Sequence, residues 1–123
     1  MTGVVLYIED NQDNILLVQR LLKRRCPDVR LHTTMTGPDG IRMAIDHQPT
    51  LILLDNHLPG TSGEQVLRQL AADQATAAIP VVILSGDSSP ITVNELLAAG
   101  AAEFLIKPFD IHQLLDIIGR YLH

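Results

Sequence analysis

The stretch from Leu51 to Asp55 constrains the fold most, because four apolar residues run directly into a carboxylate. An apolar run without alternation is typical of a strand buried on both faces of a parallel sheet. Asp55 then lies at the carboxyl end of that strand, where open α/β sheets build their binding sites. Taken alone, an Asp just before the Pro59-Gly60 turn is more simply a turn residue, so the rest of the chain decides its role.

Four other strand-like segments alternate with helical patterns along the chain. We expect strands at 4–8, 29–33, 51–54, 80–84 and 103–106, the second of them at a sheet edge. Helices are expected from the Asn11 cap to about 25, through 41–45 after Gly37-Pro38-Asp39-Gly40, after the 60–63 loop with Ser62 as cap, over 91–99, and from the Asp110 cap to about 122. This order predicts the α/β class, a single doubly wound five-stranded parallel sheet of the (βα)5 type covered by helices on both faces.

Length, composition and charge narrow the function. A chain of 123 residues with 46% hydrophobic residues predicts one domain, 1–123. The net charge of −5 argues against nucleic-acid binding, and the apolar runs are too short to span a membrane. The single Cys26 suits a reducing compartment. We therefore expect a cytoplasmic protein that binds neither nucleic acid nor membrane.

The polar residues gather at the carboxyl ends of the expected strands: Glu9 and Asp10, Asp55, Ser85 and Lys107. At about 4 Å and an effective dielectric of about 20, each pair of carboxylates repels by about 4 kcal/mol, so we expect a cation among them. Carboxylate oxygens with room for water suit Mg²⁺, whereas no Cys/His spacing suits zinc.

Such an arrangement predicts a site for a phosphoryl group. A metal ion and the Lys107 ammonium neutralise phosphoryl oxygens, and the Ser85 hydroxyl donates to one of them. An uncoordinated oxygen of Asp55 can then attack phosphorus. Gly86 lets a phosphate approach the backbone closely.

The chain resembles the receiver domain of two-component response regulators over essentially its whole length. The motifs that carry the resemblance are Glu9-Asp10, the stretch 53–60, Ser85-Gly86 and Lys107-Pro108-Phe109. The resemblance implies a flavodoxin-like sheet with strand order 2-1-3-4-5. It also implies that a histidine kinase or a histidine phosphotransfer protein phosphorylates Asp55.

The resemblance further implies the roles of the site residues. Asp10 and Asp55 bind Mg²⁺ directly, the backbone carbonyl of His57 is a third ligand, and Glu9 acts through water. Lys107 pairs with the phosphate, Ser85 follows the phosphoryl oxygens, and Phe104 is the aromatic switch residue. Two positions depart from the most frequent pattern. Glu9 replaces an Asp. Phe104 lacks the hydroxyl of the frequent Tyr, so no hydrogen bond can hold its ring in the inward rotamer.

The resemblance implies a signalling phosphoacceptor that assists its own phosphorylation and dephosphorylation, rather than an enzyme. Its output is expected through the fourth helix, the fifth strand and the last helix. One alternative is a degenerate receiver that docks proteins without phosphate. Another is a haloacid-dehalogenase-like phosphatase, which needs an Asp where His57 stands and a cap for which the chain has no room.

Three further questions stay open at this stage. The receiver is either a single-domain regulator or part of a hybrid sensor kinase. Leu16 and Leu17 either widen the core face of the first helix or dock a phosphotransfer helix bundle. Ile117 and Tyr121 form either an apolar partner patch or the edge of the core.

Overall fold

The computed structural model describes residues 1–123 and contains one five-stranded parallel sheet with the order β2-β1-β3-β6-β7. The strands are Gly3–Ile8 (β1), Val29–Thr34 (β2), Leu51–Asp55 (β3), His57–Leu58 (β4), Thr61–Ser62 (β5), Val81–Ser85 (β6) and Glu103–Ile106 (β7). The helices are Gln12–Arg25 (α1), Gly37–His47 (α2), Gly63–Ala72 (α3), Pro90–Ala98 (α4) and Ile111–Tyr121 (α5). The expected fold class and the implied strand order are confirmed, since β6 and β7 are the fourth and fifth strands of the sheet.

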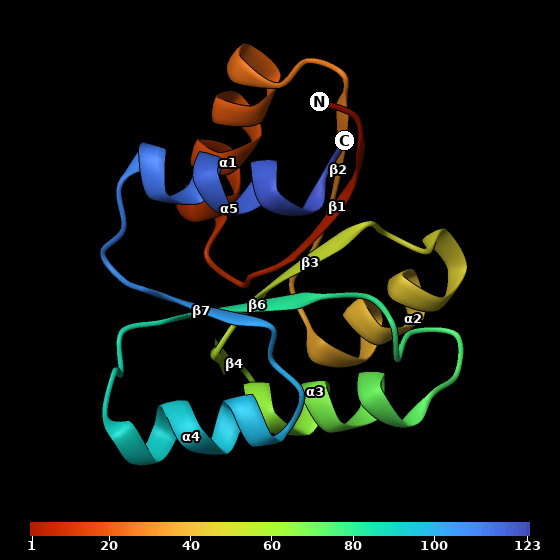
Figure 1. Ribbon diagram of the computed structural model, residues 1–123, viewed down its shortest axis with the longest axis vertical. Helices are drawn as coiled ribbons and strands as arrows, with labels where there is room; N and C mark the ends of the chain where they lie inside the picture. Colours follow the sequence, from red (N-terminus) through yellow and green to blue (C-terminus); the bar gives the residue numbers. More distant parts are fainter.

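Helices cover both faces of the sheet: α1 and α5 lie on one face, and α2, α3 and α4 on the other (Figure 1). Side chains of β3 alternate between two buried clusters. Leu51 and Leu53 join the cluster under α1 and α5, and Ile52 and Leu54 join the other. All four are 0% exposed, which explains why this strand has no polar position before Asp55.

The helix starts follow the capping chemistry of the sequence. Asn11, Ser62 and Asp110 cap α1, α3 and α5 as expected, and the last two form capping boxes with a glutamine three residues later. The expected start of α2 is too late. Its N-cap is Thr36, and Pro38 lies in the first turn, where a missing N–H leaves no hydrogen bond unmade.

The segment 60–63, expected to be a loop, is partly paired. β5 pairs antiparallel with β4, so that His57 lies opposite Ser62 and Leu58 opposite Thr61. The turn between them contains Gly60 with a φ of +76°, a conformation that glycine adopts without strain. This small hairpin follows directly on Asp55.

Burial settles two of the open questions about apolar residues. Leu16 and Leu17 are 46% and 59% exposed, so the broad-core interpretation of α1 is wrong. Ile117 is 4% exposed within the core under α1 and α5, and Tyr121 packs against the same core. The partner-patch interpretation of these two residues is therefore wrong, and they form the core edge.

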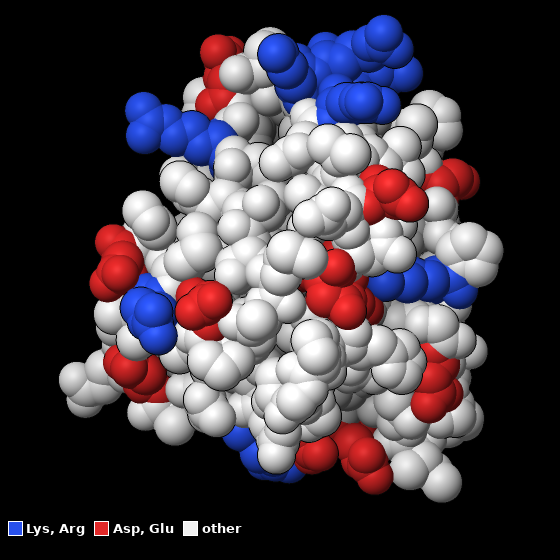
Figure 2. Space-filling model, turned by 180° about the vertical axis from the view of Figure 1, so that it is seen from behind, with Lys and Arg blue, Asp and Glu red and all other residues white.

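The charged side chains are unevenly spread. Lys23, Arg24 and Arg25 occupy the last turn of α1, and the blue cluster at the top of Figure 2 lies over this end of the helix. Cations there stabilise the negative end of the helix dipole. No helix is long and apolar enough to cross a membrane.

Candidate functional site

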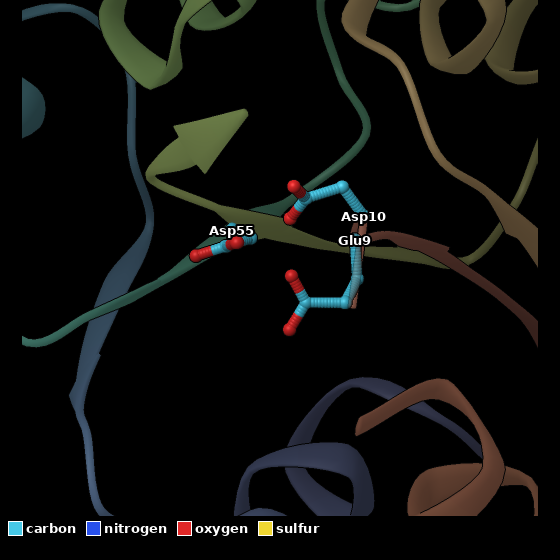
Figure 3. A group of neighbouring side chains, drawn as sticks. All are labelled: Glu9, Asp10 and Asp55. Carbon is cyan, nitrogen blue, oxygen red and sulfur yellow. The ribbon is translucent and has the colours of Figure 1, made fainter. Parts of the chain in front are cut away.

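Three carboxylates meet where the two central strands end. β1 and β3 are parallel neighbours with Ile8 opposite Leu54, so the residues that follow Ile8 lie beside Asp55. Figure 3 shows Glu9 and Asp10 extending from the end of β1 towards Asp55. One carboxylate oxygen of each residue lies within 4.8 Å of the others, as the sequence predicted for this edge of the sheet.

The three carboxylates differ in burial. Glu9 is 0% and Asp55 3% exposed, whereas Asp10 reaches solvent. At 4.8 Å and an effective dielectric of about 20, each ionised pair repels by roughly 3 kcal/mol. Lys107 offsets part of this repulsion, because its Nζ lies 3.0 Å from Asp55 Oδ1 and 3.4 Å from Glu9 Oε1. One ammonium for three carboxylates still leaves the site strongly negative.

The two oxygens of Asp55 have different surroundings. Oδ1 accepts hydrogen bonds from Lys107 Nζ and, at 3.3 Å, from the backbone N–H of His57. Oδ2 accepts no hydrogen bond from the protein and is not completely buried. Asp55 is thus held through one oxygen and presents the other to an incoming group.

Glu9 also uses its two oxygens unequally. Oε1 accepts from Asn14 Nδ2 at 2.8 Å, from Tyr7 Oη at 3.1 Å and from Lys107. Oε2 is the one buried side-chain polar atom without a hydrogen-bond partner. Burial, followed by the adjacent Asp55, raises the pKa of Glu9, and Asn14 and Lys107 oppose this rise.

Tyr7 and Asn14 were not identified as site residues from the sequence. A signal for Tyr7 exists, since residues two apart on a strand share a face, and Tyr7 precedes Glu9 by two. Burial raises the pKa of Tyr7, so its hydroxyl keeps its proton and acts as a donor. Asn14 lies in the first turn of α1, whose cap places it beside the end of β1.

Ser85 lies at the end of β6, next to β3, but is turned to its own loop. Its Oγ accepts from the backbone N–H of Asp87 at 3.0 Å and from Asn56 Nδ2 at 3.4 Å. Phe104 lies on β7 and packs against the core under α3 and α4. The predicted residues therefore lie at one edge of the sheet, except that Phe104 pairs with Ile83, two residues before Ser85 on β6.

The donor set suits a hard divalent cation. All candidate ligands are oxygens, one of them exposed to water, and the buried Oε2 of Glu9 lacks a partner. Mg²⁺ prefers oxygen ligands, few carboxylates and retained water. The expected preference for Mg²⁺ over zinc agrees with this chemistry.

Comparison with known proteins places this geometry in a family. A family model described as the response regulator receiver domain matches residues 5–119. The response regulator PleD of Caulobacter vibrioides is 34% identical over 110 residues, which are 89% of this chain and 24% of PleD. The polar-differentiation response regulator DivK of Brucella ovis is 28% identical over 122 residues, 99% of this chain and 98% of DivK. The chain thus spans about a quarter of the first relative and nearly all of the second.

Among solved structures, the receiver domain of the sensor histidine kinase PA1611 from Pseudomonas aeruginosa PAO1 is similar to this chain. The TM-score is 0.87 with 25% identity, over 98% of both chains. In that protein a magnesium ion is coordinated in the active-site cleft.

Proposed function

The chain belongs to the response regulator receiver domain family, and on that premise we propose that Asp55 accepts a phosphoryl group from a phosphohistidine donor in a Mg²⁺-dependent reaction. The observation that carries the proposal is the state of the Asp55 carboxylate. Its Oδ1 is held by Lys107 and by the His57 N–H, and its Oδ2, within the acidic cluster, accepts no hydrogen bond from the protein.

The transfer moves one phosphoryl group and balances without a further reactant. Asp55 Oδ2 forms a bond to phosphorus as the phosphorus–nitrogen bond of the donor breaks. The histidine nitrogen leaves with the electron pair of that bond. Lys107 pairs with the phosphoryl oxygens. The Ser85 hydroxyl, which donates to the backbone carbonyl of Asp87 at 3.4 Å, turns to donate to one of those oxygens.

The metal ion would be held directly by Asp10, Asp55 and the backbone carbonyl of His57, and through water by Glu9. Mg²⁺ supplies positive charge that neutralises the carboxylates and the phosphoryl oxygens. The acidic cluster and the magnesium ion in the cleft of the PA1611 receiver domain support this assignment. Dephosphorylation by water at the same centre would make the chain assist both steps.

The donor, a histidine kinase or a histidine phosphotransfer protein, would dock on α1. The exposed Leu17 lines a groove that continues past Val18 to Lys107 and Phe109, beside Asp55. Output would pass through α4, β7 and α5, whose exposed apolar residues are Ile91, Leu97, Ile106 and Ile111. Movement of Ser85 and Phe104 would link the two surfaces.

The experiment is to incubate the protein with acetyl phosphate and Mg²⁺ and to measure phosphorylation by intact-protein mass spectrometry. We expect one added phosphoryl group on the native chain and none on Asp55→Asn, with unchanged far-ultraviolet circular dichroism. Omission of Mg²⁺ should abolish the addition. A stable phosphoryl group on Asp55→Asn would show that another side chain is the acceptor.

A second experiment tests the alternative of a degenerate receiver. Beryllofluoride with Mg²⁺ is added to isotope-labelled protein, and the amide signals of α4 and β7 are followed by NMR. Shifts in these elements support phosphate-linked switching. If acetyl phosphate does not phosphorylate the chain and its NMR spectrum does not respond to beryllofluoride, the alternative of a phosphate-independent docking module is favoured.

A further inference from the structure

We infer that Tyr7 and Asn14 are positioning residues of the cation site, which act by holding Oε1 of Glu9 so that Oε2 is left for the cation or for water bound to it. The inference rests on the proposed Mg²⁺ site and extends it to two residues outside the carboxylate cluster. Neither residue carries charge.

The hydrogen bonds of Glu9 are the first argument. Tyr7 Oη, Asn14 Nδ2 and Lys107 Nζ all donate to Oε1, at 3.1, 2.8 and 3.4 Å. A carboxylate oxygen has about two lone-pair sites, so Oε1 has no capacity left for another donor or for a cation. Only Oε2 remains available.

The second argument is the cost of leaving Oε2 alone. Glu9 is 0% exposed, and its Oε2 has no partner. A buried acceptor without a hydrogen bond costs about 1–3 kcal/mol, and more when it is charged. Buried unsatisfied groups are rare in native proteins, and those that occur often have a catalytic or ion-binding role. A cation, or a water that it holds, removes this cost.

The third argument is that two separate elements enforce the same arrangement. Tyr7 is 1% exposed in the core under α1 and α5, so its ring is fixed by packing and its hydroxyl is placed with it. Asn14 approaches from α1, and its backbone N–H already bonds to the Asn11 cap. The Asn14 side chain is therefore free to serve Glu9 and is not needed to start the helix.

The test is to measure the Kd for Mg²⁺ by isothermal titration calorimetry of the full chain with MgCl₂ at constant ionic strength. We expect Tyr7→Phe and Asn14→Ala each to weaken Mg²⁺ binding by about tenfold, the lower end of what loss of a partner of a metal ligand costs. Tyr121→Phe is the matched control. It also removes a tyrosine hydroxyl that donates to a glutamate, Glu103, but far from the site, and it should leave the Kd for Mg²⁺ unchanged.

A double-mutant cycle separates positioning from general destabilisation. In a Glu9→Gln background, Tyr7→Phe should no longer change the Kd, because the group that it positions has lost its charge. Unfolding in EDTA is measured for every variant, so that a loss of stability is recognised independently of the metal.

The outcomes are distinct. If the native chain binds Mg²⁺ and is phosphorylated on Asp55 but Tyr7→Phe binds Mg²⁺ equally well, the positioning role is wrong and the proposed function stands. A Tyr7→Phe effect that persists undiminished in the Glu9→Gln background also overturns it. If the native chain binds no Mg²⁺, the proposed site and this inference both fall.

Discussion

The two tyrosines of the chain show what burial does to a single hydroxyl. Each donates to a glutamate, Tyr7 to Glu9 and Tyr121 to Glu103. Burial, followed by the hydrogen bond to Glu103, raises the pKa of Tyr121 to about 12. Because this pKa is raised in the folded chain, the unfolded chain loses its proton first, and the contribution of Tyr121 to stability falls as the pH rises above about 10.

We therefore predict a pH-dependent effect of Tyr121→Phe. Near neutral pH the variant should be less stable by roughly 1 kcal/mol, the net value of one hydrogen bond. This difference should shrink as the pH rises from 10.0 towards about 12. Urea unfolding of both chains at several pH values measures it. A constant difference over this range would contradict the role of the Glu103 hydrogen bond.

At the scale of elements, α1 has apolar residues on two of its faces, one buried and one exposed. Ile15, Val18, Leu21 and Leu22 are buried against the sheet as the sequence predicted, and Leu16 and Leu17 project outwards. Exposed leucines contribute little to stability. Leu17 lines a groove that reaches Lys107, and this place supports the proposal of a partner surface on α1, whereas Leu16 lies in a second groove beside the end of β2.

Replacement of both Leu16 and Leu17 by Asp should slow phosphotransfer from a phosphorylated histidine phosphotransfer protein and leave labelling by acetyl phosphate intact. The free energy of unfolding should change by no more than about 0.5 kcal/mol per site, as for most surface substitutions. Ile45→Asp, at an exposed apolar residue of α2 on the other face of the sheet, is the control. Equal slowing with both donors would contradict docking on α1.

The contact between α2 and β1 depends on Gly40. A Cβ at this position would lie 2.4 Å from Ile8 Cδ1 and 2.8 Å from Ile8 Cγ1, so only glycine lets the helix approach the strand this closely. Two effects of Gly40→Ala oppose each other. Alanine gains about 1 kcal/mol of helix propensity, and overpacking of a filled core costs about 1–3 kcal/mol.

We expect overpacking to dominate, so that Gly40→Ala lowers the free energy of unfolding by about 1 kcal/mol. Gly119→Ala on α5 is the matched control. Its Cβ would meet only Met1 Cε at 3.4 Å, so propensity should raise stability by up to about 1 kcal/mol. Urea unfolding measures both, and stabilisation by Gly40→Ala would show that Ile8 moves aside at little cost.

At the scale of the molecule, cation binding at the proposed site would be coupled to folding, because the acidic cluster exists only in the folded chain. Glu9 and Asp10 are far from Asp55 in the sequence, and the fold brings them within 4.8 Å. A cation that binds this cluster binds the folded state alone, and so stabilises the fold.

At a Mg²⁺ concentration ten times the Kd, the free energy of unfolding should rise by about 1.4 kcal/mol over its value in EDTA. Asp10→Asn should abolish this increase and stabilise the metal-free chain, since it removes one of the three repelling carboxylates. Thermal and urea unfolding in MgCl₂ and in NaCl of equal ionic strength test the effect. An identical rise in both salts would mean general screening and no specific site.

The sequence by itself determined the layered architecture and most of the site. The resemblance to receiver domains supplied the strand order. Strands that alternate with capped helices specify a parallel sheet whose strands all end at one edge, and this places Glu9, Asp10, Asp55, Ser85 and Lys107 at that edge. These features follow from local rules: the period of apolar residues, the chemistry of helix caps and the direction of each strand. Asp55, at first no more than a turn residue, acquires its role from this convergence.

Only the tertiary structure decided how each side chain uses its atoms. The burial of Ile117 and the exposure of Leu16 depend on which residues of distant segments meet. The same holds for the oxygens of Glu9, one bonded to donors from β1, α1 and the segment after β7, and the other left unpartnered. The hydrogen bond from Lys107 to Glu9 joins residues 98 positions apart and has no periodic signature in the sequence, because it is set by packing in three dimensions.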